Sequence, residues 1–164
     1  MTDLQQRRLR PSLLDQLTDE APFDKQQATP KGFSDRELRR SIVRDLEWLF
    51  NTTELAAVEE LEAYPEVARS VLNFGLPTLV GRLASGINEV LLERSVKQTI
   101  VNFEPRILPG VKVRVVKDKE QMSAGGLRFE IEGELRAQPA PLYLLLRTDI
   151  DLDNRVAKVT DLSE

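Results

Sequence analysis

The chain has 164 residues, of which 41% are hydrophobic and 30% are charged, as expected for one soluble globular domain. It contains no cysteine and no histidine, which excludes disulfides, thiolate metal sites and any serine–histidine or cysteine–histidine catalysis within the chain. The net charge is -4, from 23 basic and 27 acidic residues whose signs are interspersed, so neither a nucleic-acid groove nor a polybasic membrane patch is favoured.

The first 33 residues are expected to form a flexible or partner-docking arm ahead of a single domain over 34–164. The arm is polar, and three prolines interrupt any long element in it. A short amphipathic stretch over 9–17 fits one helical turn or a docking segment, and a disordered tail is the alternative. The N-terminal residues contain no apolar signal core, and no apolar run is long enough to span a bilayer. A cytoplasmic location is therefore expected.

The domain begins with a strong helix signal. Ser34 and Glu37 have the spacing of a capping box, with Ser34 as the N-cap. The apolar residues that follow recur at helical spacing: Leu38, Ile42, Leu46, Leu49 and Phe50. The pattern predicts an amphipathic helix over 35–50 that ends near Asn51. Trp48 lies off this apolar stripe, which suggests contact with a second chain, although packing within the chain is the simpler alternative.

Two further helices are predicted after a connector over 51–63. Pro65 occupies a tolerated first-turn position of a short helix, which should stop near Gly75. A longer helix is predicted over about 84–103. Its apolar stripe is broad, which indicates burial between two surfaces.

After Pro105 the hydrophobic period changes from helical to two. The alternating apolar positions are Val111, Val113, Val115, Leu127, Phe129, Ile131, Leu142, Leu144, Leu146, Ile150 and Leu152. A last strand is predicted over about 155–159. One polar face indicates antiparallel strands in a half-solvated sheet. The fold class is therefore α+β, with N-terminal helices packed on a C-terminal antiparallel sheet of about four strands.

The first two strands also suggest a register. If the loop around Gly125 and Gly126 closes a hairpin, the cross-strand pairs are Val113 with Ile131, Val115 with Phe129, Arg114 with Glu130, and Lys112 with Glu132. Two pairs then face the core and two join opposite charges on the other face. Each such pair contributes roughly 0.2–1 kcal/mol.

The bend Glu104-Pro105-Arg106 is the most distinctive segment for function. Proline removes a backbone donor and pushes the preceding residue out of the helical region, so the helix should end here. The two charged side chains, two residues apart in an extended chain, project to similar sides. A rigid loop with a carboxylate and a guanidinium suits charge-assisted pairing with another chain. The alternative is a plain connector whose charges pair with each other or with water.

Four blocks of the sequence resemble the TssE family of type VI secretion baseplate subunits and its lysozyme-like relatives in phage-tail baseplates. The blocks are Phe103-Glu104-Pro105-Arg106-Ile107, the charged helical segment over 40–52, the segment over 64–77, and the closing strand over 146–152. They occur in order and span about 34–152, so the arm is not covered.

The resemblance implies a structural subunit of a baseplate wedge, bound to TssF and TssG, connected indirectly to TssK, and linked to the contractile sheath. Carried over to this chain, Glu104 and Arg106 would anchor the interface, and Pro105 would fix their presentation. Arg44 and Asp45 are weaker candidates, for which a solvated helix face is the alternative. The resemblance implies no catalytic residue, cofactor or metal.

Two other interpretations remain at this point. A muramidase-like glycoside hydrolase needs two carboxylates across a cleft, and Glu104 is the natural acid. Arg106 nearby favours the ionised form of that carboxyl, which is the wrong form for a general acid. A generic interaction module is the third interpretation. Asp149, Asp151 and Asp153 resemble a cation site, but the first two fit alternating solvent-facing positions better.

Overall fold

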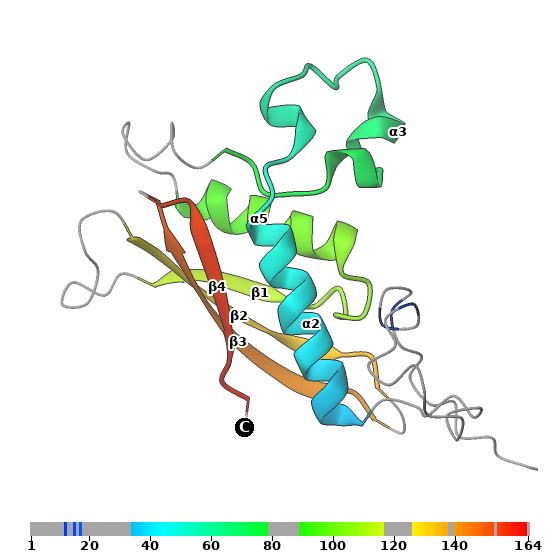
Figure 1. Ribbon diagram of the computed structural model, residues 1–164, viewed down its shortest axis with the longest axis vertical. Coiled ribbons are helices and arrows are strands. Elements are labelled where there is room, and N and C mark those ends of the chain that lie inside the picture. The colour runs from blue at the N-terminus through cyan, green and yellow to red at the C-terminus, as the bar shows by residue number, and fades with distance from the viewer. Residues whose placement is uncertain are drawn as a thin grey trace, which may run out of the picture.

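A computed structural model describes residues 12, 15, 17, 34–78, 89–116, 126–137, 140–152 and 154–163. Helices α2 and α5 cover one face of a four-stranded antiparallel sheet (Figure 1). The elements are α2 (Asp35–Phe50), η1 (Leu55–Ala57), α3 (Pro65–Ala68), η2 (Val71–Asn73), α5 (Glu89–Phe103), β1 (Lys112–Val116), β2 (Gly126–Leu135), β3 (Leu142–Asp151) and β4 (Val156–Asp161). The predicted α+β class is confirmed.

Helix α2 begins and ends where the sequence predicts. The Ser34 hydroxyl accepts a hydrogen bond from the Glu37 N–H at 3.3 Å, and the Glu37 carboxylate accepts one from the Ser34 N–H at 2.8 Å. This reciprocal capping box satisfies donors that a helix otherwise leaves unpaired at its N-terminus. All five predicted apolar positions of the helix are buried.

The sheet has the strand order β1-β2-β3-β4, and the four predicted cross-strand pairs between β1 and β2 are all present. Buried residues alternate with more exposed ones along β2, β3 and β4, including Phe129 and Leu146 at 1% and 0% exposure, and Val113 is the buried residue of β1. The opposite face carries ion pairs such as Arg128 with Asp149. Because only one face of the sheet is buried, the helices pack on that face, α2 against β4 and α5 against β1.

Two element boundaries differ from the predictions, and a third is not tested. The described part of α5 begins at Glu89, and the predicted start at 84 lies outside the described residues. Helix α3 ends at Ala68 instead of continuing toward Gly75. Ser70 follows in an extended conformation and caps the 3-10 turn η2 through its hydroxyl, which interrupts the helix. Strand β4 runs two residues beyond the predicted end.

Polar side chains on or next to both helices form hydrogen bonds with backbone groups of the two edge strands, β4 and β1. Asn51, just after α2, donates its Nδ2 to the carbonyl of Ala157 and accepts the N–H of Ala157 through its Oδ1, each at 2.8 Å. Glu47 accepts the N–H of Val159, and Glu93 of α5 accepts the N–H of Val115 in β1. Unpaired backbone groups at an edge strand invite other strands, so these contacts protect the edges and fix each helix to its strand.

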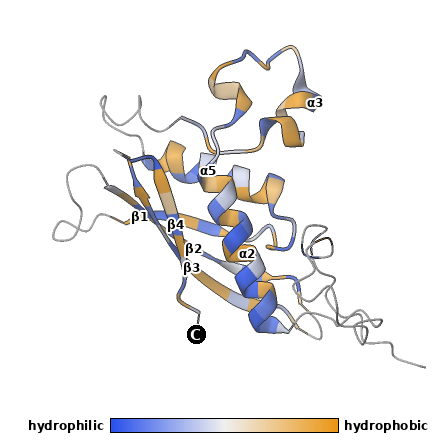
Figure 2. Ribbon diagram, viewed as in Figure 1, coloured by the Kyte–Doolittle hydropathy of each residue, from blue (hydrophilic) through white to orange (hydrophobic). Residues whose placement is uncertain are grey.

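Residues 52–76 leave the body of the domain and return to it, and we call this segment the 52–76 excursion. Its ends are joined by a parallel bridge between Thr53 and Leu76. Asn73 is buried and links two parts of the excursion. Its Oδ1 accepts a hydrogen bond from the Ala56 N–H, and its Nδ2 donates one to the Ala68 carbonyl. The excursion exposes four large apolar side chains, those of Val58, Tyr64, Val71 and Leu72. Hydrophobic stretches, drawn in orange, lie along its ribbon in Figure 2.

Within the described core, strand β3 carries a polar side chain that the fold does not satisfy. Thr148 of β3 is fully buried, and its hydroxyl has no hydrogen-bond partner within the described part of the chain. Replacing it with valine keeps the β-branched shape and removes the unpaired hydroxyl. We expect Thr148→Val to raise the free energy of unfolding by about 1 kcal/mol in urea denaturation. Thr160→Val, at an exposed position of β4, is the control and should change stability by less than about 0.5 kcal/mol. A destabilised Thr148→Val chain would show that the hydroxyl is bonded.

Candidate functional site

The Glu-Pro-Arg bend lies at the C-terminal end of α5 and is held on both sides by backbone hydrogen bonds. The Glu104 N–H donates to the Ile100 carbonyl at 2.8 Å, which completes the last turn of the helix. The carbonyl of Arg106 accepts the Arg136 N–H at 2.8 Å, and Ile107 forms a bridge to Leu135 at the end of β2. The bend therefore joins helix to sheet in a fixed geometry, as the proline in the sequence predicts.

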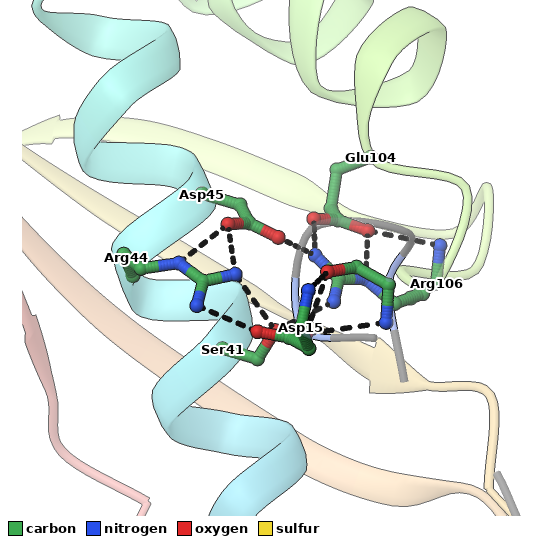
Figure 3. Close-up of polar contacts among 7 residues, drawn as sticks. Asp15, Ser41, Arg44, Asp45, Glu104 and Arg106 are labelled. Carbon is green, nitrogen blue, oxygen red and sulfur yellow. Dashed lines mark hydrogen bonds and ion pairs between the residues drawn. The ribbon is translucent and has the colours of Figure 1, made fainter. Parts of the chain in front are cut away.

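Both charges of the bend are paired inside the chain. Glu104 Oε1 accepts from the backbone N–H of Arg106 at 3.2 Å and from its Nε at 2.7 Å, while Oε2 accepts from its Nη2 (Figure 3). The guanidinium continues to α2, where Nη1 donates to the hydroxyl of Ser41 at 3.0 Å and Nη2 donates to Asp45. The side chains of Glu104 and Arg106 are only 5% and 21% exposed. Burial alone would lower the pKa of Arg106, but Glu104 and Asp45 raise it above its ordinary value.

A second arginine extends this cluster along α2. Arg44 donates its Nε and Nη2 to Asp45 Oδ1 at 2.9 and 2.7 Å, and its Nη1 to Asp15 Oδ1 at 2.6 Å. The Ser41 hydroxyl donates to Asp15 Oδ2 at 2.9 Å, so Ser41 connects both arginines with the arm. We call these four residues, together with Glu104 and Arg106, the arginine–carboxylate network. It contains three carboxylates and two guanidinium groups.

Asp15 reaches the network from the arm. Ser12 and Asp15 form a reciprocal capping box of their own: the Asp15 N–H donates to the Ser12 hydroxyl, and the Ser12 N–H and hydroxyl both donate to Asp15 Oδ2. Burial alone would raise the pKa of the Asp15 carboxyl. Hydrogen bonds from Arg44, Ser12 and Ser41 outweigh burial and lower that pKa from 3.8 to about 2. The carboxylate therefore stays ionised across the physiological pH range.

Four of the six network residues are candidates from the sequence, whereas Asp15 and Ser41 are not. The spacing Ser12-x-x-Asp15 is itself a capping-box signal that marks a helix start in the arm. Asp15 and Leu17 are helical, in agreement with the helical turn predicted over 9–17. Apart from these two residues and Ser12, that stretch lies outside the described residues. No comparable local signal identifies Ser41, because a serine in a helix interior is ordinary.

The structure changes how the bend can work. The family resemblance implies a loop whose Glu104 and Arg106 anchor an interface with another chain, yet the two side chains bind each other and α2. The alternative in which the charges pair with each other describes the structure better. Arg44 and Asp45 lie in the same network rather than on a plain solvated helix face. The assignment of these residues and Pro105 to partner binding stays a prediction.

An open groove of about 510 Å³ lies beside the network, and we call it the Trp48 groove. Its apolar walls are formed by Leu46, Trp48, Leu49, Phe74 and Phe103, and the bend and Ser12 complete it. Phe74 and Phe103 meet edge to face with ring centroids 5.4 Å apart, which joins the 52–76 excursion to α5. Trp48 is 51% exposed, and the Arg44 guanidinium lies 5.3 Å from the centre of its ring.

The network does not have the geometry of a hydrolytic site. A general acid must present a protonated oxygen to a substrate, but both oxygens of Glu104 accept hydrogen bonds from Arg106. Among the described residues, no group of three or more acidic side chains is arranged to hold a metal ion. Asp149 pairs with Arg128 and Asp151 binds Asn154, while Asp153 lies outside the described residues.

Comparisons with known proteins agree with this fold. A family model described as baseplate wedge protein gp25 matches residues 36–140. A solved chain from a structure entitled "The baseplate complex from the type VI secretion system" superposes with a TM-score of 0.50 at 17% identity, over 70% of this chain and 93% of that chain. A comparison with curated proteins gave no match. None of the helices described here is long and apolar enough to cross a membrane.

Proposed function

The chain belongs to the baseplate wedge protein gp25 family and has a structural role in a baseplate, and we propose that this baseplate is part of a type VI secretion machine. In this proposal the chain acts in the cytoplasm. It binds TssF and TssG in the wedge, connects through them to TssK, and links the wedge to the contractile sheath. The match to the family model and the similar fold in a type VI secretion baseplate support this assignment.

The Trp48 groove is the observation that carries the proposal. Hot spots of protein interfaces are rich in tryptophan and arginine and lie in well-packed pockets. Here an exposed tryptophan lies beneath an arginine, beside two phenylalanine rings and a rigid bend. The groove is built mainly from α2, the excursion and the end of α5, with Ser12 of the arm at its border, so most of its shape is set by the domain before any partner binds. Such preorganisation reduces the entropy cost of binding.

The network gives Glu104, Pro105 and Arg106 a specific part in this mechanism. Arg106 already pairs with Glu104 and Asp45, so a new ion pair between Arg106 and a partner is not expected to add much binding free energy. The charged pair instead holds the bend against α2, and the exposed Pro105 forms part of the groove wall. Arg44, whose side chain is 35% exposed, is the network arginine most open to a partner.

The 52–76 excursion supplies a second contact surface in this proposal. Its exposed apolar residues Val58, Tyr64, Val71 and Leu72 have between 61% and 80% of their surface accessible. Contiguous exposed apolar surface often marks a protein interface. Because Phe74 joins the excursion to the groove, a partner that fills the groove can extend over this surface. No observation in the site favours the hydrolase alternative.

The proposal is tested by co-purification with TssF and TssG from the native host. We expect Trp48→Ala to weaken that complex at least about tenfold, because truncating a central aromatic anchor typically costs more than 1 kcal/mol of binding free energy. The exposed position of Trp48 means that the free energy of unfolding should change by less than about 1 kcal/mol.

Tyr143→Ala is the matched control, since Tyr143 is an equally exposed aromatic residue, at 52%, on the far face of the sheet. It should leave the affinity for TssF and TssG unchanged. Equal affinities for the wild-type and Trp48→Ala chains would remove the groove from the interface. Failure of the wild-type chain to bind TssF and TssG would overturn the proposed function itself.

A further inference from the structure

Asp15 occupies a site on the domain surface that is built to hold a carboxylate. Its Oδ1 accepts from Arg44 Nη1, and its Oδ2 accepts from the Ser41 hydroxyl as well as from the N–H and hydroxyl of Ser12. The Asp15 side chain is only 11% exposed. Within the described residues, the hydrogen bonds and the ion pair between the arm and the domain all involve this one carboxylate, which is 26 residues from Ser41 in the sequence.

The donors on the domain do not depend on Asp15 for their position. Arg44 is held by Asp45 through two hydrogen bonds and by the Trp48 ring, and Ser41 is a buried residue of α2 that also accepts from Arg106. Without Asp15, Arg44 Nη1 and the Ser41 hydroxyl would point at an open position beside the groove. An acceptor group with two oxygens, such as the carboxylate that occupies the position here, satisfies both donors at once.

The charge balance leads to the same conclusion. With Asp15 in place the network holds three negative and two positive charges, and Asp15 therefore leaves it with one excess negative charge. Without Asp15 the two arginines balance Asp45 and Glu104. The domain thus tolerates either an occupied or an empty site, and the occupant need not come from the same chain.

We propose that the corner formed by Arg44 and Ser41 is a carboxylate-binding site that Asp15 fills in the free chain and that an acidic residue of a partner protein takes over on assembly. The partner segment carries this carboxylate next to a large apolar side chain. The acid binds Arg44 and Ser41, and the apolar side chain enters the Trp48 groove, which borders the site through Asp45, Ser12 and the Trp48 ring. Release of Asp15 therefore accompanies filling of the groove. The identity of the partner as a baseplate subunit rests on the proposed function; the carboxylate site itself does not.

The site is tested first on the chain alone, with a synthetic peptide of residues 9–20 as the probe. Trp48 is the single tryptophan of the sequence, so its fluorescence reports on the ring that Arg44 covers. We expect the Asp15→Ala chain to bind this peptide at least about tenfold more tightly than a peptide carrying Asn in place of Asp15, as for a hydrogen-bonded charge. The wild-type chain, with its site filled, should bind the Asp peptide about tenfold more weakly.

Adding Arg44→Gln to the Asp15→Ala chain should abolish the preference between the two peptides. Equal binding of both peptides, no binding of either, or a preference that survives Arg44→Gln would overturn the carboxylate site.

The exchange is then measured with TssF and TssG: Asp15→Ala should raise the affinity of the chain for them several-fold, because the competing carboxylate is gone. Glu134→Gln removes a charge from the exposed end of β2 and should not change it. Unchanged or weaker binding by Asp15→Ala would overturn the exchange, whereas failure of the wild-type chain to bind would count against the proposed function.

Discussion

Replacing Arg106 with alanine should lower the free energy of unfolding by about 3 kcal/mol, measured by urea denaturation with circular dichroism. The reason is the carboxylate that the substitution leaves behind. Glu104 is buried, with 4% of its surface exposed, and three of the hydrogen bonds that it accepts come from Arg106. Two of these come from the guanidinium and disappear in the variant. A buried carboxylate without its partner is costly because the solvation lost on folding is no longer compensated.

The double variant Glu104→Leu/Arg106→Leu separates the charge effect from a simple loss of packing. It removes both members of the pair, so no uncompensated charge remains, and we expect it to be more stable than Arg106→Ala. Asp45 retains Arg44 as its partner in both variants. An Arg106→Ala chain that loses less than about 1 kcal/mol would show that Glu104 is solvated and that the network does not hold the bend.

Gly75→Ala is expected to have a comparably large effect, at least about 3 kcal/mol, for a reason of backbone geometry. Gly75 has φ of 141°, a region that L-residues with a Cβ rarely adopt. A Cβ at this position would lie 2.6 Å from backbone atoms of Thr52, Thr53 and Glu54, which cannot move away independently of the chain. The substitution should therefore break the bridge between Thr53 and Leu76 that closes the 52–76 excursion.

The same change should also impair the groove, since Phe74 precedes Gly75 and forms part of its wall. We expect weaker binding of TssF and TssG together with the loss of stability. Gly110→Ala is the matched control, because a Cβ there meets no atom within 4 Å. It should leave the unfolding free energy within about 0.5 kcal/mol of wild type. If Gly75→Ala were as mild as Gly110→Ala, the closure of the excursion would not depend on this glycine.

The Arg106 and Gly75 variants act on the same groove through two different parts of its lining. Arg106 fixes the bend at the end of α5 against α2, and Gly75 allows the excursion to return so that Phe74 contacts Phe103. The stability of the domain and the shape of its proposed docking surface are therefore linked. Binding measurements on either variant need a parallel stability measurement, whereas Trp48→Ala reports on the groove alone.

The sequence by itself determined the fold class, helix α2 and the pairing of the first two strands. The capping box of Ser34 and Glu37 predicted the start of α2, and alternation at period two predicted which residues of β1 and β2 face each other. These features are encoded locally: a cap requires residues three apart, and a register shift by one would bury the polar face. The proline of the bend predicted the end of α5 for the same reason.

Only the tertiary structure decided where the charges go. The contacts of Arg106 with Asp45 and Ser41 join residues 61 and 65 positions apart, and Asp15 meets Arg44 across 29 positions. Spacing along the chain does not reveal which polar groups the packing of α2, α5 and the arm will bury together. Once they are buried, each charge must find a partner within the fold, because the water that would otherwise solvate it is excluded. For this reason the two charges of the bend pair within the chain, and the bend itself forms part of the groove wall.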